Sequence, residues 1–318
     1  MTDCRNGAGW DTFWNTSTAQ ASYCSDAGAH PVLGAHWRGK LTALPKLSSS
    51  SRHIDLATGN GIVIRYVRSL LGANAPRTWG LDLSAAAIDR LKRDYPDVIG
   101  VVADVGSTGL DGATFDLVTS QFGVEYAGLE GFVEAARLVR PGGTLAVVAH
   151  SRPGIIHDEC ATNIDVIERV RSEGIFRKTR THFAIAGSYG RSVGAGRALK
   201  GYKQGRRQLR RLLQQFGAGA ANGFLLQLNN DLERIGSRVS SYDSRELGAW
   251  LHKLDCESLD YLSRMNAMTR AALSRQDLGR VVLQLERSGM AIDEVEAIFD
   301  DDVAQIGWSI TARRHSGV

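Results

Sequence analysis

The sequence predicts an α/β protein with a doubly wound parallel sheet that is interrupted by a helical insertion. Between residues 52 and 150, strand-like and helix-like segments alternate with short joints, as in strand–helix–strand units. The strand segments, such as IDL, VVA and LAVVA, are nearly all apolar, as strands buried on both faces require. From residue 151 to 277 helical spacing dominates and β-branched runs vanish, so this stretch breaks the alternation.

Composition and length are those of a globular protein. The chain has 318 residues, a hydrophobic fraction of 43% and a charged fraction of 23%, which suggests two domains or one domain with a large insertion. No stretch approaches the roughly 18 apolar residues of a membrane span, and the N-terminus lacks a signal pattern. Four scattered cysteines form no CxxC pair: Cys4, Cys24, Cys160 and Cys256. We therefore expect reduced thiols in a cytoplasmic protein.

The first region, residues 1–48, is expected to be an N-terminal helical segment rich in aromatic side chains. A helix is expected after His30-Pro31, extending through Leu41. The aromatic residues of this region are Trp10, Phe13, Trp14, Tyr23 and Trp37. The serine-rich stretch 46–51 then reads as a flexible joint.

Residues 49–150 are expected to form the nucleotide-binding part of the sheet. The predicted strands are Ile54–Leu56, Thr78–Leu83, Val98–Ala103, Phe115–Ser120 and Thr144–His150. The predicted helices are Ile62–Leu71, Ala85–Asp94 with Ser84 as its cap, and a third over about 129–139. Because the joints are short, the strands should lie parallel with helices on both faces.

The last two regions are a helical insertion over 151–277 and a sheet-completing segment over 278–318. Residues 278–289 predict a helix that ends at Gly289, and two strand-like runs follow it. A helix and two strands at the end of the chain would complete the sheet begun before residue 150. An insertion that starts after the fifth strand leaves from the edge of the sheet where ligands bind. We therefore interpret it as a cap for the substrate.

The turn after the first strand, in HIDLATGNG, carries the first chemical signal. Gly59 and Gly61 let a ligand approach the backbone closely, but Ile64 stands where the dinucleotide fingerprint requires its last glycine. Asp55 lies just before the turn and would repel a pyrophosphate. It would favour a ligand that carries an ammonium group.

Two further acids lie at matching strand ends. Asp82 ends the second strand and can accept hydrogen bonds from both hydroxyls of a ribose. Asp104 ends the third strand and can accept from an exocyclic amine such as that of adenine. Together with Asp55, they describe a ligand with an amine, a ribose and an adenine but no phosphate, which is S-adenosyl-L-methionine.

These segments resemble class I S-adenosylmethionine-dependent methyltransferases, close to the small-molecule branch that contains ubiquinone and menaquinone biosynthesis enzymes. The resemblance rests, in this order, on IDLATGNG, GLDLS, VVADV, FDLVTSQFGVEY and LVRPGGTLAVVAH. It covers residues 50–150 well and 278–314 moderately, and it leaves out the insertion. It implies a Rossmann-like, seven-stranded sheet. The sequence departs from the family at Ala57, where glycine is commonest, which is a mild change.

The resemblance also implies which residues bind the cofactor. The turn from Ala57 through Thr58 to Gly61 would wrap the methionine part, and Asp82, followed by Leu83, would bind the ribose. The adenine would be bound by Asp104 and the amide of Val105, while Gln121 and Phe122 would line the side of methyl transfer. Two aromatic residues of the first region, Trp14 and Tyr23, could contact the sulfonium through a cation–π interaction, or could belong to the core.

Methyl transfer from a sulfonium is an in-line displacement, and a base assists it where the acceptor loses a proton. His150 ends the fifth strand at the cofactor edge and is the candidate base, although a side chain there can also simply pack. Glu125 and Tyr126 follow the fourth strand and could contact the acceptor or only shape the pocket. The run HDEC at 157–160 does not direct its side chains at one centre, so we expect no metal site.

The insertion carries a concentrated basic charge. The chain has a net charge of +4, yet eleven Lys or Arg and no Asp or Glu lie between Arg177 and Arg211, so the remainder is net negative. Within 197–216, a basic stripe separate from an apolar one is formed by Lys200, Lys203, Arg207 and Arg210. This stripe could be a solvated face, could recognise an acidic substrate, or could contact an anionic membrane surface. Nucleic acid is the least favoured partner, because no RNA-binding module accompanies the stripe.

The sequence thus predicts a methyltransferase that moves a methyl group from S-adenosyl-L-methionine to oxygen, carbon or nitrogen of a small organic acceptor, which is anionic or lipid-like. No NPPY or DPPY follows the fourth strand, which argues against the adenine- and glutamine-methylating subfamilies. Two alternatives are methylation of RNA or protein through the basic cap, and a catalytically silent, cofactor-binding regulatory protein. The oligomeric state is not predicted.

Overall fold

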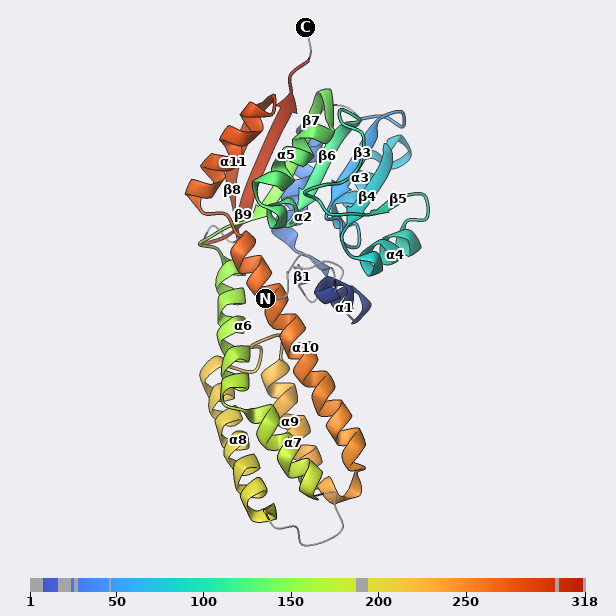
Figure 1. Cartoon of the computed structure of the whole chain (residues 1–318). Helices are drawn as coiled ribbons and strands as arrows, with labels where there is room; N and C mark the ends of the chain where they lie inside the picture. Colours follow the sequence, from blue (N-terminus) through green and yellow to red (C-terminus); the bar gives the residue numbers. More distant parts are fainter. Residues whose placement is uncertain are drawn as a thin grey trace. The chain divides into compact units, whose positions relative to one another are not determined.

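The computed structural model describes residues 8–16, 24–25, 28–45, 47–186, 194–300 and 303–316. Contacts divide the chain into two compact units (Figure 1). The first, here called the α/β unit, contains Met1–Asp158 and Ala267–Val318. The second, the helical unit, contains Glu159–Asn266.

The α/β unit is built on a seven-stranded sheet. Its strands, in spatial order, are β5 (Ile99–Val102), β4 (Arg77–Asp82), β3 (Arg52–Leu56), β6 (Phe115–Gln121), β7 (Val139–His150), β9 (Ala304–Arg314) and β8 (Met290–Asp300). The five strands from β5 to β7 run parallel, and β9 is antiparallel to both β7 and β8. This arrangement confirms the predicted doubly wound sheet and its completion by two strands from the end of the chain.

Helices cover both faces of the sheet (Figure 1). One face is covered by α2 (Pro31–Ala43), α3 (Ile62–Leu71) and α4 (Ala85–Asp94), the other by α5 (Leu129–Leu138) and α11 (Arg275–Arg287). A large apolar core lies between the sheet and α5 and α11, and a smaller one lies under α3 and α4. Helix α1 (Ala8–Thr16) contacts α4, and short segments complete the unit: β1 (Cys24–Ser25), β2 (Gly28–Ala29), η1 (Gly72–Asn74) and η2 (Val124–Ala127).

Local sequence signals fix the beginnings of the helices that follow the first two strands. Gly61 caps α3 with a φ of 82°, a left-handed conformation that glycine adopts without steric cost. Ser84 caps α4, and its Oγ accepts a hydrogen bond of 3.2 Å from the main-chain N–H of Ala87. Both helices therefore start directly at the carboxyl edge of the sheet, where the predicted cofactor site lies.

The helical unit consists of α7 (Ile175–Ala186), α8 (Ala195–Phe216), α9 (Phe224–Gly236), η3 (Val239–Ser241) and most of α6 (Ile155–Ser172) and α10 (Ser244–Ala271). Its core is a continuous apolar cluster between these helices. Buried residues of α8 recur at spacings of three and four, as a helix packed along one side requires: Ala198, Tyr202, Gly205, Leu209 and Leu212. Within the described residues, no helix is both long and apolar enough to cross a membrane.

The division by contacts differs from the division that the sequence predicts. Residues 1–48 belong to the α/β unit instead of forming a separate segment, since α2 packs on α3 and β8. The insertion, expected over 151–277, is compact over Glu159–Asn266. The borders shift because α6 and α10 each run without a break from one unit into the other, so no turn in the sequence marks the change. Its role as a substrate cap stays a prediction.

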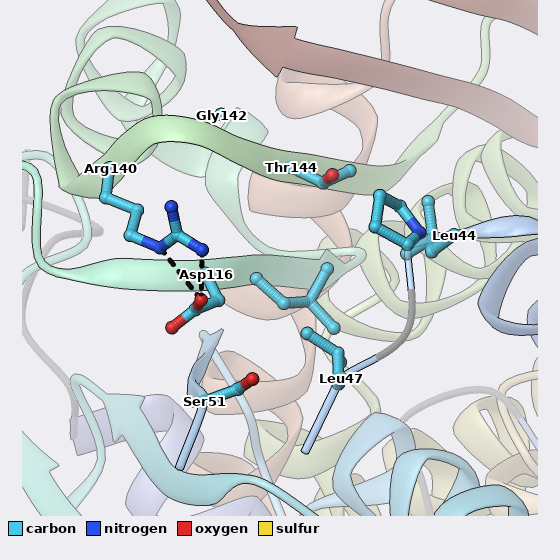
Figure 2. Close-up of a pocket in the computed structure, with 9 residues that line it drawn as sticks. Leu44, Leu47, Ser51, Asp116, Arg140, Gly142 and Thr144 are labelled. Carbon is cyan, nitrogen blue, oxygen red and sulfur yellow. Dashed lines mark hydrogen bonds and ion pairs between the residues drawn. The ribbon is translucent and has the colours of Figure 1, made fainter. Parts of the chain in front are cut away.

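A cavity of about 100 Å³ lies at the amino ends of β3 and β6, the edge opposite to the predicted cofactor site (Figure 2). The Arg140 guanidinium lies against Asp116 there, with Nε 2.8 Å from Oδ1. The main-chain N–H of Arg52 donates to the other oxygen of Asp116 at 2.8 Å. The carboxylate is thus already paired with structural partners, and we assign this cavity no function.

Candidate functional site

The turn between β3 and α3 has the conformation that its glycines predict. Gly59 and Gly61 have φ angles of 54° and 82°, and Ala57 also adopts a left-handed φ of 50°. The main-chain N–H of Thr58 donates to the carbonyl of Leu81 in β4 at 2.9 Å, which ties the turn to the neighbouring strand. Alanine in this conformation is strained by its Cβ. The alanine at position 57, where glycine is commonest, therefore adds local strain to the backbone of the turn.

Asp55 lies beneath this turn and is buried, with 1% of its surface exposed. Its two carboxylate oxygens accept hydrogen bonds of 2.7 Å each, from the hydroxyls of Thr58 and Thr119. Burial raises the pKa of Asp55 to about 7, although these two hydrogen bonds oppose the rise. The carboxyl group can therefore change its charge near neutral pH.

Asp82 at the end of β4 organises the backbone of the same edge. It accepts hydrogen bonds from the main-chain N–H groups of Gly59 at 2.8 Å and Ser84 at 2.9 Å, one on each oxygen. Leu83, the residue after Asp82, is partly buried. Burial raises the pKa of Asp82 to about 6 against these hydrogen bonds. Each carboxylate oxygen has a second lone pair, so the group can still accept from a pair of hydroxyls.

Asp104 follows β5 and is partly buried. Its Oδ1 accepts from the main-chain N–H of Gly106 at 2.8 Å, which closes a tight turn around the buried Val105. Asp55 and Asp82 thus lie at the carboxyl ends of β3 and β4, and Asp104 follows the adjacent strand β5. The predicted set of acids at one edge of the sheet is present in the fold, while the role of each in binding stays a prediction.

Helix α1 covers part of the turn. A Cβ built on Gly59 would lie 2.5 Å from the ring of Trp14, so the indole is packed directly on this glycine. Asp11, one turn earlier, accepts hydrogen bonds from the hydroxyl of Ser84 and from the main-chain N–H of Ala86 at 3.3 Å. Trp14 is therefore at the predicted cofactor edge. The other aromatic candidate, Tyr23, lies outside the described residues.

Gln121 ends β6 and Phe122 follows it, between the glycine turn and the end of β7. The indole N–H of Trp37, from the buried face of α2, donates to the side-chain oxygen of Gln121 at 2.6 Å. Phe122 is 6% exposed, and its ring lies over the imidazole of His150 with centroids 4.4 Å apart. Gln121 is therefore held by a structural partner, and Phe122 forms one wall around the imidazole.

His150 and Glu125 form a buried pair at the carboxyl end of β7. Oε1 of Glu125 lies 2.7 Å from Nδ1 of His150 and accepts from its main-chain N–H at 2.9 Å. Because a carboxylate only accepts, the neutral imidazole carries its proton on Nδ1 and has a lone pair on Nε2. Within the described part of the chain, Nε2 makes no hydrogen bond, and neither does the buried Oε2 of Glu125.

Aromatic rings surround this pair. The ring of Tyr126 meets the imidazole of His150 edge-on at 5.9 Å, and Trp10 from α1 meets Tyr126 edge-on at 5.8 Å. With Phe122 they form an aromatic wall beside the imidazole of His150. All three predicted catalytic residues, His150, Glu125 and Tyr126, are therefore brought together, although their roles in catalysis are untested.

Two contacts at this site could not be found from sequence spacing. Trp37 and Gln121 are separated by 84 residues, and the imidazole of His53 lies 2.8 Å from the hydroxyl of Thr119, 66 residues away. His53 and Thr119 do carry a sequence signal, because each is a polar side chain next to an apolar residue in a strand of the central sheet. No group of three or more His, Cys, Asp or Glu side chains suited to a metal ion is found among the described residues.

The basic stripe of the insertion lies on α8 opposite its buried residues. Five of its cations are exposed and form no ion pair with any residue that the structure describes: Arg197, Lys200, Lys203, Arg207 and Arg211. Arg210, predicted as part of the stripe, is exposed but pairs with Glu233 at 3.3 Å. Arg206 is buried and pairs with the same carboxylate at 3.1 Å, so not every cation of the run is free on the surface.

Comparison with known proteins agrees with this geometry. Residues 54–147 match the family model described as a methyltransferase domain. Among solved structures, the chain is similar to a geranyl diphosphate C-methyltransferase from Streptomyces coelicolor A3(2), at 12% identity over 98% of both chains with a TM-score of 0.50. No curated protein matches the sequence.

Two further structures are similar to this chain. One is an S-adenosylmethionine-dependent methyltransferase from Mesorhizobium loti, at 16% identity over 89% of this chain and 100% of that one, with a TM-score of 0.45. The other is a chain of the Haloferax volcanii complex between the Trm112 methyltransferase activator and a proposed methyltransferase, at 24% identity and a TM-score of 0.34. That match covers 45% of this chain and 60% of the other.

Proposed function

We propose that the protein is a class I methyltransferase that transfers a methyl group from S-adenosyl-L-methionine to a small organic acceptor. The match of residues 54–147 to the model of a methyltransferase domain supports this. We assign the ammonium group of the cofactor to Asp55, its ribose to Asp82 and its adenine to Asp104 with Val105. The order of these acids along β3, β4 and β5 supports this assignment.

The observation that carries the proposal is the buried pair of His150 and Glu125. Nδ1 is held by Glu125, so Nε2 is the basic nitrogen. When bound, S-adenosyl-L-methionine would supply the methyl group, and Nε2 of His150 would take the proton that the acceptor loses. The resulting imidazolium is stabilised by Glu125, whose other oxygen is buried without a hydrogen bond in the described part of the chain.

The surroundings of His150 favour an acceptor with an apolar or aromatic body. Phe122, Tyr126 and Trp10 supply aromatic faces and edges there, and a polar acceptor would lose hydrogen bonds to water without replacement. The Streptomyces coelicolor structure holds geranyl diphosphate beside S-adenosyl-L-homocysteine. The fold can thus accommodate an anionic, lipid-like acceptor, in agreement with the class that we propose.

A second candidate is methylation of RNA or protein through the basic stripe of α8. The five exposed cations without ion pairs in the described part of the chain favour an anionic partner. Three aromatic residues of the basic region, Phe176, Phe183 and Tyr202, are buried and cannot stack on bases, and Tyr189 lies outside the described residues. The stripe therefore supports an electrostatic contact without base recognition. A cytoplasmic location stays a prediction, supported by the free thiols of Cys160 and Cys256.

The test is to incubate the protein with methyl-labelled cofactor and a cell extract separated into small molecules, RNA and protein. We expect label in the small-molecule fraction, and its loss in Asp82→Asn, which removes the proposed ribose acceptor. Label in RNA or protein would instead support the second candidate. Binding of the cofactor without any transfer of label would show a regulatory protein and would refute the proposed activity.

A further inference from the structure

A buried chain of hydrogen bonds connects β3 and β6 to the carboxyl group beneath the glycine turn. Nε2 of His53 lies 2.8 Å from Oγ1 of Thr119, and Oγ1 of Thr119 donates to Oδ1 of Asp55 at 2.7 Å. All three side chains are buried, with exposed fractions of 0%, 0% and 1%. His53 therefore reaches Asp55 through a single hydroxyl, without contacting the turn itself.

The direction of these hydrogen bonds follows from proton counting. An ionised Asp55 can only accept, and the hydroxyl of Thr119 has one proton to give. When that proton is donated to Asp55, the hydroxyl must accept from His53, so the imidazole carries its proton on Nε2. The carbonyl of Ile54, 3.5 Å from the same hydroxyl, is the competing acceptor. By occupying a lone pair of Thr119, His53 directs the only proton of the hydroxyl toward Asp55.

A histidine at position 53 is less favourable for folding than an aliphatic residue would be. The strand is central in the sheet, and an aliphatic side chain would pack there without any polar atom. Nδ1 of His53 is buried and makes no hydrogen bond within the described residues. Burial lowers the pKa of His53 to about 3, so the ring is neutral at physiological pH. A buried polar group that is only half satisfied is typical of a functional site.

We propose that His53 is a positioning residue for cofactor binding, which acts through Thr119 to hold Asp55 ionised and oriented toward the ammonium group of S-adenosyl-L-methionine. The inference rests on the proposed role of Asp55 as the acceptor for that ammonium. His53 and Thr119 touch neither the cofactor nor the methyl group. Their effect is expected on the affinity for the cofactor and on its pH dependence, while the rate at saturating cofactor should change little.

The pH dependence follows from the groups around Asp55. It is faced by the hydroxyls of Thr58 and Thr119 and, across the turn, by the carboxyl group of Asp82, which disfavours a second negative charge. Burial raises the pKa of Asp55 to about 7, so cofactor affinity should fall as the pH drops through this value. A hydrogen bond donated to the ionised carboxylate opposes the rise in the pKa of Asp55. Removing His53 should therefore move the midpoint upward.

The experiment is calorimetric titration with S-adenosyl-L-homocysteine at several pH values, using the full chain. We expect His53→Leu to weaken binding by about three- to tenfold and to raise the pH midpoint by about half to one unit, since a tenfold change equals one pKa unit. His53→Gln keeps a donor near the position of Nε2 and should bind nearly as the wild type. Thr119→Val should behave as His53→Leu, and Thr119→Ser as the wild type.

These variants separate the inference from the site assignment. If Asp55→Asn binds the cofactor as tightly as the wild type, the proposed role of Asp55 fails. If Asp55→Asn loses binding while His53→Leu and Thr119→Val keep the wild-type affinity and midpoint, only the inference about His53 is refuted. If His53→Gln is as weak as His53→Leu, the imidazole acts by shape and the inference is also refuted. Should His53→Leu not fold, the valine and serine variants at position 119 carry the same comparison.

Discussion

Replacement of Asp55 by asparagine should stabilise the fold while it abolishes cofactor binding. The carboxyl group is buried, and burial raises its pKa from 3.8 to about 7. Because the folded-state pKa lies above the unfolded value, the protonated group favours folding at low pH. That stability is lost as the pH rises from 3.8 through 7, where the unfolded chain ionises before the folded one. Asparagine resembles the protonated acid and shows no such loss.

The magnitude follows from the size of the shift. About 3 pKa units at 1.36 kcal/mol each give an upper limit of about 4 kcal/mol for holding the charge in the fold at alkaline pH. About 2 kcal/mol of this develops between pH 5 and pH 7. Asparagine has one acceptor oxygen where the carboxylate offers two, so a hydroxyl of Thr58 or Thr119 must turn. We therefore expect a net gain of about 2 kcal/mol at pH 8.

The assay is urea unfolding of the wild type and of Asp55→Asn at pH 5 and pH 8. The difference in the free energy of unfolding should widen toward pH 8. Asp116→Asn is the matched control on the neighbouring strand. Although burial acts to raise its pKa, the hydrogen bonds from Arg140 and from the main chain of Arg52 lower it, so its contribution stays constant between these pH values. A difference for Asp55→Asn that is equal at both pH values, or larger at pH 5, would refute the reasoning.

Three further predictions concern the turn and the proposed base. Glu125→Gln should lower the methylation rate by about 10²–10⁴-fold, because glutamine does not stabilise a protonated His150. Calorimetry should show unchanged cofactor binding, and an unchanged rate would contradict the proposed role of Glu125. Gly59→Ala places a Cβ 2.5 Å from the ring of Trp14 at a φ of 54°, so we expect lost cofactor binding and about 1–3 kcal/mol lower stability in denaturant titration. Ala57→Gly removes the Cβ that is strained at a left-handed φ of 50°, and it should stabilise the α/β unit by about 1 kcal/mol in the same assay. A loss of stability would show that no strain is stored at this position.

Much of the fold follows from local sequence signals. The helices Ile62–Leu71 and Ala85–Asp94 begin and end where the sequence predicts, because Gly61 and Ser84 mark their starts. The apolar runs of the strands identify the buried sheet. The acids at the strand ends could be placed at one edge because parallel strands that are joined by helices all end on the same side.

Contacts between distant segments could not be predicted in this way. The hydrogen bond from Trp37 to Gln121 and the one between His53 and Thr119 depend on which strands and helices become neighbours, and spacing along the chain carries no such information. The pair of His150 and Glu125 was predicted as two candidate residues and not as a pair. Its hydrogen bonds arise because the end of β7 lies beside the turn that follows β6.

The methyl group of Ala57 has a consequence for how related sequences can vary. A Cβ on Gly123 would stand only 2.3 Å from the Cβ of Ala57, so the two positions share room for a single methyl group. With glycine at position 57, a Cβ at position 123 would still meet Oγ of Ser120 at 3.0 Å and the carbonyl of Leu56 at 3.3 Å, but it would avoid the closest clash. With alanine at position 57, position 123 is confined to glycine. Among homologous sequences the two sites should therefore change in concert, and either substitution made alone should reveal the dependence of each on the other.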